Sequence, residues 1–251
     1  MPSTDSTALT TRTALVTGGS GGIGRAVVRR LARDGYAVAV HYAGNQAKAE
    51  ALVEEIAATG GRAIAVGGDV ADEHAMAAAF DRAESAFGGL DVVVHTAGVM
   101  RLKPIAELDL DDLDAMHRTN IRGTFVVAQQ SARRLRPGGA LINFSTSVMG
   151  LQFPGYGAYA ASKGAVEAMT LVLARELRGR DVTVNAVAPG PTATPLFLEG
   201  KDQDTVDRLA AQSPLERLGA PEDIAELTAF LASPAGHWVN GQNIRSNGGI
   251  V

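Results

Sequence analysis

A tyrosine and a lysine four positions apart, Tyr159 and Lys163, stand at the head of a long helical pattern. Residues four apart share one face of a helix, so their side chains reach the same space. An ammonium about 4 Å from a phenol contributes up to about 4 kcal/mol at an effective dielectric near 20, which lowers the phenol pKa by at most roughly three units. The pair therefore predicts a phenol that exchanges a proton with a carbonyl or alcohol oxygen near neutral pH.

A second chemical signal is the glycine-rich segment 17–24, which follows the first apolar run and opens a helical pattern. A pyrophosphate needs bare backbone N–H groups, close approach without Cβ atoms and the positive end of a helix dipole. The glycines fit G-x-G-x-x-G in one register and T-G-x-x-x-G-x-G in another, and the spacing leaves both open. We predict that the segment binds a dinucleotide through Gly18, Ser20, Gly22, Ile23 and Gly24.

The end of the second apolar run indicates which dinucleotide is bound. An NAD site usually carries Asp or Glu about 20 residues after the glycine turn, but no carboxylate follows this run before Glu50. Its absence removes repulsion against a 2′-phosphate, and His41 and Asn45 can donate hydrogen bonds to one. We predict NADP(H) as the preferred cofactor, with NAD(H) as the alternative because plain turn residues explain His41 and Asn45 equally well.

Composition excludes several other classes of function. The 251 residues carry 23 Lys and Arg against 27 Asp and Glu, which gives a net charge of −4. A chain with this charge has no overall positive field that would attract nucleic acid or an anionic membrane. There is no Cys, so thiolate nucleophiles, disulfides and Cys-ligated zinc are excluded, and we expect no metal site. No run approaches the ~20 apolar residues of a membrane span, and no signal-peptide pattern opens the chain. We expect a cytoplasmic protein.

Short apolar runs alternate with longer helical patterns from residue 13 onward, which is typical of βαβ units that build a parallel sheet. Most of the runs are continuous, as strands buried on both faces require. We predict a Rossmann-like, doubly wound α/β fold with a seven-stranded parallel sheet and helices on both faces. The predicted strands are Thr13–Thr17, Ala37–Tyr42, Ala63–Val66, Leu90–Thr96, Ala140–Phe144, Val182–Val187 and Asn243–Ser246.

Helix and domain boundaries follow from caps and composition. Asp109 is a helix-capping residue, and the helix that it starts is expected to continue to Arg136, just before Pro137. No composition shift divides the chain. Residues 12–251 are therefore predicted to form a single domain, and residues 1–11 a flexible N-terminal tail.

Ordered motifs cover nearly the whole chain, from about Thr13 to Val251. They are Thr17-Gly18-x-x-x-Gly22-x-Gly24, Asp69-Val70, Ala97-Gly98, Asn120, Ser147, Tyr159-x-x-x-Lys163 and Pro189-Gly190. In these motifs the sequence resembles the short-chain dehydrogenase/reductase family, and within it the 3-oxoacyl-acyl-carrier-protein reductase and carbonyl reductase branches.

The resemblance implies a set of catalytic residues. Ser147 would hydrogen-bond the substrate carbonyl, Tyr159 would give or take the proton, and Asn120 would hold a water molecule of a proton relay. Lys163, beside Tyr159, would also bind the nicotinamide ribose, so both line the cofactor. Ser145 competes with Ser147, but Ser147 fits the Ser-x-x-Gly spacing of the family better.

The resemblance also implies further cofactor contacts. Asp69 would contact the adenine and Thr192 the nicotinamide carboxamide. His95 departs from the family pattern, since many relatives carry Asn there, and we interpret it as a structural substitute rather than a catalytic base. The remaining cofactor contacts are predicted at Val70, Ala97, Gly98, Pro189 and Gly190.

The segment at about residues 191–215 is predicted to form the substrate loop, because open α/β sheets bind ligands beyond the strand ends. Its apolar residues indicate a substrate with an apolar part. We therefore predict an NADPH-dependent reductase of a ketone or 3-oxoacyl carbonyl, with alcohol oxidation as the reverse reaction. The alternatives are a non-catalytic NADP-binding regulatory protein and an NAD-dependent alcohol or sugar dehydrogenase.

Self-association is expected as well. The helix that carries Tyr159 has a second smooth stripe, formed by Ala161, Ala165, Ala168 and Val172. A helix that is apolar on both sides is usually buried on both sides, and the sheet covers one of them. We expect the other side to pair with a second copy in a homodimer or, by the resemblance, a homotetramer. A small-molecule carbonyl substrate is the other expected partner.

Overall fold

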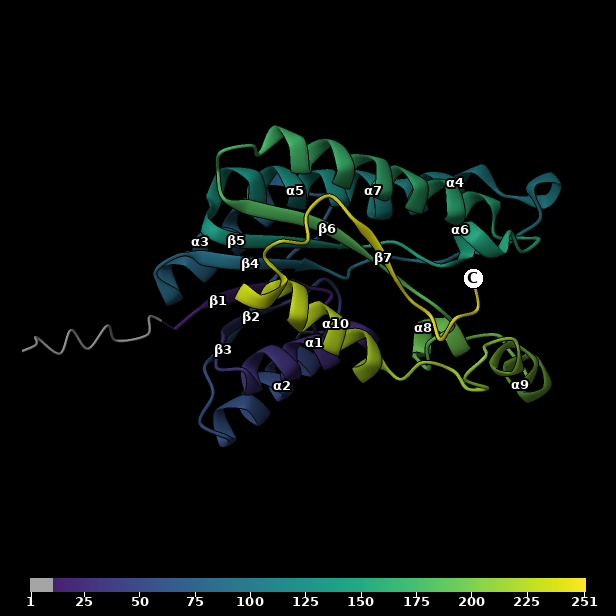
Figure 1. The fold of residues 1–251 in the computed structure, drawn as a ribbon, viewed down its shortest axis with the longest axis horizontal. Coiled ribbons are helices and arrows are strands. Elements are labelled where there is room, and N and C mark those ends of the chain that lie inside the picture. Colours follow the sequence, from purple (N-terminus) through teal and green to yellow (C-terminus); the bar gives the residue numbers. More distant parts are fainter. Residues whose placement is uncertain (1–10) are drawn as a thin grey trace, which may run out of the picture.

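The structure of the protein is a computed structural model in which residues 11–251 are described, so the predicted tail lies outside the described residues except for Thr11. Seven parallel strands form one sheet in the order β3-β2-β1-β4-β5-β6-β7 (Figure 1). The strands are β1 (Thr13–Thr17), β2 (Ala37–Tyr42), β3 (Ala63–Gly67), β4 (Leu90–His95), β5 (Leu135–Phe144), β6 (Val182–Pro189) and β7 (Asn243–Ser246). The predicted Rossmann-like, seven-stranded parallel sheet is confirmed, and its order reverses between β1 and β4, where such sheets bind ligands.

Helices connect the strands and cover both faces of the sheet. The long helices are α1 (Gly22–Arg33), α2 (Gln46–Ala58), α3 (Glu73–Phe87), α4 (Leu110–His117), α5 (Gly123–Arg134), α7 (Gly157–Glu176), α9 (Gln203–Ala211) and α10 (Pro221–Ala232). Short turns are η1 (Ile105–Glu107), η2 (Arg118–Arg122), α6 (Val148–Leu151), α8 (Pro195–Leu198) and η3 (Pro234–Gly236). Within residues 11–251 no helix is long and apolar enough to cross a membrane.

The core consists of two apolar layers, one on each face of the sheet. The layer under α1, α2 and α10 contains Leu31, Val40 and Ile224, and the layer under α3, α5 and α7 contains Phe80 and Leu141. In Figure 1 the first group of helices lies below the sheet, and α5 and α7 lie above it. Because both faces are covered, the central strands are continuous apolar runs.

The helix expected from Asp109 to Arg136 differs from the structure in two places. Asp109 does cap α4, accepting a 2.9 Å hydrogen bond from the backbone N–H of Asp111. The chain then makes a π-helical turn at η2 and ends α5 at Arg134. Arg136 is already in β5, because its guanidinium binds both carboxylate oxygens of Asp91 in β4, at 2.9 and 2.6 Å, and holds the chain extended.

The two-layer core makes a testable prediction about Leu141, which is 0% exposed in β5. Leu141→Ala removes apolar contacts and leaves a cavity, so we expect the free energy of unfolding to fall by about 2–5 kcal/mol. Leu215→Ala, at a position that is 63% exposed, is the matched control and is expected to change it by about 0.5 kcal/mol or less. Urea titration measures both, and equal losses would contradict the assignment of the core.

Candidate active site

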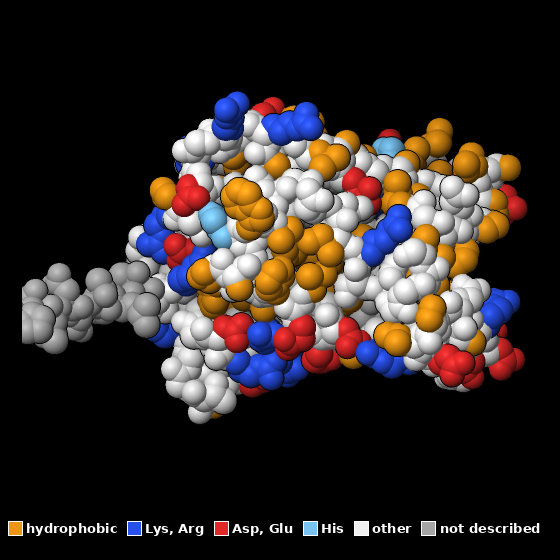
Figure 2. Space-filling model, viewed as in Figure 1, with side chains coloured by type: hydrophobic (Ala, Val, Ile, Leu, Met, Phe, Trp, Pro, Cys, Tyr) orange, Lys and Arg blue, Asp and Glu red, His pale blue; other side chains and the backbone are white. Residues whose placement is uncertain are grey.

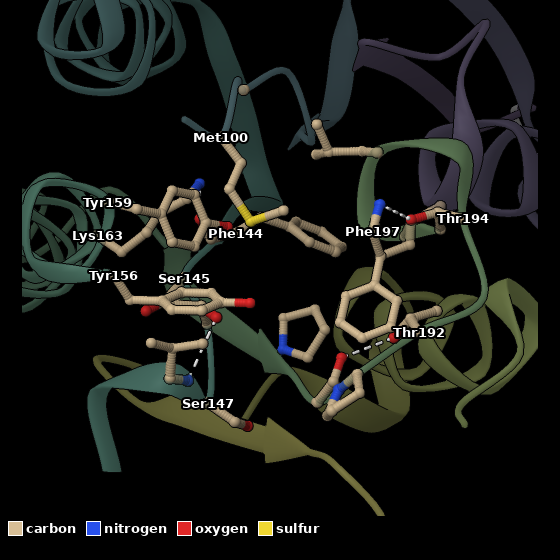
Figure 3. Close-up of a pocket in the computed structure, with 18 of the residues that line it drawn as sticks. Met100, Phe144, Ser145, Ser147, Tyr156, Tyr159, Lys163, Thr192, Thr194 and Phe197 are labelled. Atoms are coloured by element: carbon tan, nitrogen blue, oxygen red, sulfur yellow. Dashed lines mark hydrogen bonds between the residues drawn. The ribbon is translucent and has the colours of Figure 1, made fainter. Parts of the chain in front are cut away.

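Tyr159 and Lys163 lie on the first two turns of α7 and face one cleft at the carboxyl ends of the strands (Figure 3). The Nζ of Lys163 donates a 2.8 Å hydrogen bond to the carbonyl oxygen of Phe144, the last residue of β5. The same nitrogen lies 5.9 Å from the centre of the Tyr159 ring. The structure thus brings the phenol and the ammonium together, and the bond between α7 and β5 holds them there.

The protonation of this pair differs from the sequence-based prediction. Burial raises the pKa of Tyr159 to about 12 and lowers the pKa of Lys163 to about 8. The prediction that Lys163 lowers the phenol pKa toward neutrality is therefore wrong for the protein alone, because burial removes solvation from the phenolate and this is the largest cause of the shift. Tyr159 is a protonated acid at neutral pH.

The two serines that compete for the substrate carbonyl, Ser145 and Ser147, both line the cleft. The Oγ of Ser147 donates a 2.9 Å hydrogen bond to the carbonyl oxygen of Ala188 in β6. Its side chain points away from the labelled tyrosine rings in Figure 3. The Oγ of Ser145 donates to Glu167 Oε1 at 2.5 Å. Each hydroxyl carries one proton, so both protons are used within the chain, and the role of Ser147 stays a prediction.

Thr146, between the two serines, is a site residue that the sequence analysis missed. It is buried and lines the same cleft, and its hydroxyl lowers the pKa of the Tyr159 phenol against the larger effect of burial. The signal in the sequence is a run of three hydroxyl residues directly after a strand. Spacing alone does not tell which of the three points into the cleft, because the chain leaves its regular extended form there.

Asn120 is buried in the π-helical turn η2. Its Nδ2 donates to the carbonyl oxygen of Val99 at 2.9 Å and to Ser162 Oγ at 3.1 Å, and its Oδ1 accepts from the N–H of Val99 at 2.9 Å. Both amide hydrogens are therefore used. A water molecule bound here would donate to an oxygen of Asn120 rather than accept from its amide. Isolated π turns in helices are frequent at functional sites.

His95 ends β4 and is buried between two threonines. Its Nδ1 lies 2.7 Å from Thr17 Oγ1, and its Nε2 lies 3.1 Å from Thr124 Oγ1. The Thr124 hydroxyl donates to the carbonyl oxygen of Asn120 at 2.6 Å, so it accepts from a protonated Nε2, and Nδ1 accepts from Thr17. Burial lowers the pKa of His95 to about 3, which keeps the ring neutral. These bonds support the interpretation of His95 as a structural residue.

The glycine turn fits a dinucleotide phosphate. No side chain of residues 11–251 caps the start of α1, and its first turn contains no acid, so its free N–H groups can bind an anion. Gly18 has a φ of +65°, and a Cβ on Gly24 would lie 2.3 Å from the Gly18 carbonyl oxygen. Ser20 and Gly22 complete the turn, and Ile23 lines the cleft that contains Tyr159. The predicted residues therefore surround one cradle that runs into the cleft.

The two residues predicted to meet a 2′-phosphate lie in different environments. Asn45 is exposed, and its Oδ1 accepts a 3.0 Å hydrogen bond from the N–H of Lys48, which leaves its NH₂ group as a donor. His41 is fully buried in β2, and its ring makes no hydrogen bond of standard geometry to the described residues. Burial also lowers its pKa to about 4. Because the ring is enclosed and neutral, the structure does not support the phosphate contact predicted for His41.

Asp69 and Val70 lie between β3 and α3 and pack against η2. The carboxylate of Asp69 pairs with Arg118, the first residue of η2. Val70 is buried, and a Cβ on Gly123 would lie 2.8 Å from its Cγ2. The wall predicted to contact the adenine is thus packed on the turn that carries Asn120.

The remaining predicted cofactor contacts lie at the ends of β4 and β6. Ala97 packs against Gly18, where an added Cβ would lie 3.0 Å from the Ala97 nitrogen. A Cβ on Gly98 would lie 3.5 Å from Lys163 Nζ, so a larger residue would narrow the cleft. Thr192 is buried and donates a 2.9 Å hydrogen bond to the carbonyl oxygen of Gly190. The predicted contacts that line the cleft with Tyr159 are Ile23, Gly98, Lys163, Pro189, Gly190 and Thr192.

The outer part of the cleft is apolar. The rings of Phe153 and Tyr156 lie 5.8 Å apart at 59°, and Met100 and Phe197 face the same space in Figure 3. Of the described side chains that line the cleft, Lys163 alone is charged. Residues 11–251 contain no group of three His, Asp or Glu side chains placed to hold a metal ion. The apolar lining consists of Met100, Val148, Leu151, Phe153, Tyr156, Leu196, Phe197 and Leu209.

The chain is similar to several known proteins over nearly its whole length. A family model described as enoyl-(acyl carrier protein) reductase matches residues 18–251. The chain is 44% identical over 250 residues to a short-chain type dehydrogenase/reductase of Picea abies, covering 96% of this chain and 92% of that protein. It is 41% identical to an NADPH-dependent aldehyde reductase-like chloroplastic protein of Arabidopsis thaliana, covering 96% and 94%. The structure matches a short chain dehydrogenase from Burkholderia cenocepacia in complex with NADP, at a TM-score of 0.89, 40% identity and coverage of 95% and 97%.

The glycine cradle predicts a large effect of one methyl group. In Gly24→Ala the new Cβ would lie 2.3 Å from the Gly18 carbonyl oxygen and 2.6 Å from Thr96 Oγ1, so the turn must shift. We expect the dissociation constant for NADPH to rise by about tenfold or more, which is roughly 1.4 kcal/mol. Fluorescence titration with NADPH measures it.

Gly21→Ala is the matched control in the same turn, because its nearest contact would be an ordinary 3.8 Å. We expect this variant to bind NADPH about as tightly as the parent. Equal weakening in both variants, or none in Gly24→Ala, would show that the turn does not form the cradle.

Proposed function

The chain belongs to the short-chain dehydrogenase/reductase family of NAD(P)-dependent oxidoreductases that act on CH–OH and C=O groups, and we propose that it uses NADPH to reduce a ketone or 3-oxoacyl carbonyl. The observation that carries the proposal is the cleft itself, where a protonated phenol and a buried ammonium meet a glycine cradle on one side and an apolar lining on the other. Reversible oxidation of the alcohol follows from the same groups.

Tyr159 acts as the general acid in this proposal. When bound, reduced nicotinamide supplies the hydride for the carbonyl carbon. The alkoxide oxygen that develops is a much stronger base than a phenolate, so a phenol with a pKa of about 12 still donates its proton to it. Lys163 stabilises the phenolate that remains, since its ammonium is held beside the ring by the Phe144 carbonyl.

The substrate is proposed to be uncharged around its carbonyl and to carry an apolar group. The apolar part of the cleft is lined by aromatic and aliphatic side chains, and Tyr156 adds a hydroxyl to it. A carboxylate or phosphate placed there would lose its hydration without finding a cation other than the deep Lys163. Both a small ketone and the apolar chain of a 3-oxoacyl group meet this requirement.

NADP(H) is the proposed cofactor, with NAD(H) as the weaker alternative. Asn45 is exposed at the start of α2 and offers hydrogen-bond donors rather than a carboxylate. Lys48, one turn into the same helix, adds a positive charge nearby. The NADPH-dependent relative and the NADP complex of the similar structure are consistent with this choice.

A homodimer or homotetramer is proposed for the assembly. On the outer face of α7 and the adjoining α5, Val172 is 55% and Phe125 is 53% exposed. Apolar side chains also gather over α10 and β7 in Figure 2. Trp238, between η3 and β7, is 99% exposed. Apolar patches of this kind on an enzyme favour pairing between copies.

We propose a cytoplasmic location for the protein.

Tyr159→Phe tests the acid directly. We expect kcat for ketone reduction to fall by about 10²–10⁴-fold, because the proton donor is lost, while the dissociation constant for NADPH changes little. Tyr156→Phe is the comparison within the same cleft, and we expect it to alter KM more than kcat. Absorbance at the NADPH band measures the rates. A parental rate in Tyr159→Phe would exclude the assigned acid.

Asn45→Asp tests the cofactor choice. Asp caps a helix as well as Asn does, but its charge repels a 2′-phosphate, so we expect the NADPH/NADH ratio of kcat/KM to fall by about tenfold. Gln242→Glu, beside β7 at the opposite edge of the sheet, adds the same charge as a control. An unchanged ratio in Asn45→Asp would place the 2′-phosphate elsewhere.

A further inference from the structure

Residues 247–251, which follow β7, contact three other segments of the chain that build the cleft. Asn247 packs on Gly190 at the end of β6, where an added Cβ would lie 2.7 Å from the Asn247 Cα. The carbonyl oxygen of Gly248 accepts a 2.9 Å hydrogen bond from the Oγ of Ser213, a buried residue near the end of the predicted substrate loop. Figure 1 shows that the chain then ends just below α6, which is the third segment.

The side chain of Val251 packs on the bare backbone of α6. A Cβ added at Gly150 would lie 2.4 Å from Val251 Cγ2, and its three nearest atoms would all belong to this valine. The φ of Gly150 is not in the left-handed region, so alanine fits its backbone conformation and Val251 is the obstacle. Asn247 Nδ2 donates a 3.0 Å hydrogen bond to the carbonyl oxygen of Val251, which holds the valine in this position.

The α6 turn has the cleft on one side and Val251 on the other. Val148 and Leu151 are three positions apart, so they share one face of the turn, and both line the cleft. Gly150 lies on a different face and meets Val251 there. A helix of four residues has too few internal hydrogen bonds to hold itself in place. Its position therefore depends on what packs behind it.

We propose that Val251 is a positioning residue that supports the α6 wall from behind and thereby sets the size of the apolar group that the cleft accepts. The inference rests on the carbonyl reduction proposed above. The bonds of Asn247 to Val251 and of Gly248 to Ser213 connect the α6 wall with the end of the substrate loop, so that one segment fixes both. Val251 lies behind the lining of the cleft, so it acts on the fit of the substrate and not on proton transfer.

A double-mutant cycle between Gly150 and Val251 tests the contact, with 2-butanone as the small ketone and acetophenone as the bulky one. In Gly150→Ala the new Cβ pushes α6 toward the cleft, and we expect KM for acetophenone to rise by about tenfold and KM for 2-butanone by much less. Val251→Ala removes both Cγ atoms and leaves the valine Cβ position 3.4 Å from the added methyl group, an ordinary contact. We therefore expect the double variant to recover most of the KM that Gly150→Ala loses.

Val251→Ala alone is expected to loosen the wall. We expect KM for 2-butanone to rise by about threefold and KM for acetophenone to change little, with kcat and the dissociation constant for NADPH unchanged. Val239→Ala is the matched control, because it removes the same two methyl groups from a partly buried valine before the amino end of β7. Equal KM changes for the two ketones, or a loss in Gly150→Ala that Val251→Ala does not relieve, overturns the proposal.

Hydrogen exchange followed by mass spectrometry observes the α6 wall without any turnover. The backbone N–H of Gln152 donates to the carbonyl oxygen of Val148 at 3.0 Å, and its exchange reports opening of the turn. We expect a peptide that covers residues 148–152 to exchange about threefold faster or more in Val251→Ala, and at the parental rate in Val239→Ala. A parental rate in Val251→Ala overturns the proposal even if the parent reduces no ketone, an outcome that would separately exclude the proposed function.

Discussion

The hydrogen bond from Lys163 to the carbonyl oxygen of Phe144 is the contact on which the rest of the site depends. It joins α7 to the end of β5 with a cation that is 6% exposed, and burial without an acidic partner lowers the pKa of that lysine to about 8. Burying an ammonium is costly, and a single carbonyl compensates in part. In return, the bond fixes the first two turns of α7, and with them Tyr159, at the carboxyl end of the sheet.

The parallel sheet explains why distant motifs meet at this edge. The carboxyl ends of β1, β4, β5 and β6 lie side by side, so the glycine turn, the His95–Gly98 segment, the hydroxyl run and the Pro189–Gly190 pair open onto one crevice. Neutral His95 binds Thr17 at the end of β1 and Thr124 in α5, and so connects the glycine turn to η2. The glycine turn and the turn that carries Asn120 are therefore connected through short buried hydrogen bonds.

The strands and the pairing of Tyr159 with Lys163 were accessible from the sequence, because doubly buried strands are continuous apolar runs and a spacing of four is a property of any helix. The π turn at η2 could not be predicted from the sequence. It divides one expected helix into two, and tertiary contacts such as the ion pair of Arg118 with Asp69 hold it. The hydrogen bond that Ser147 donates to Ala188 and the burial of His41 depend on neighbours far away in the chain. The prediction for the pKa of the Tyr159 phenol was wrong for the same reason, because the loss of solvation depends on how the folded chain packs around the ring.

Transfer of deuterium from NADPH that carries deuterium at both positions of C4 of the nicotinamide is the most direct test of the central claim that this cleft reduces a carbonyl. With a ketone substrate, mass spectrometry should find an alcohol that carries one deuterium at the former carbonyl carbon, in amount equal to the NADPH consumed. NADPH binding without any labelled alcohol across ketones, aldehydes and 3-oxoacyl thioesters would contradict the account.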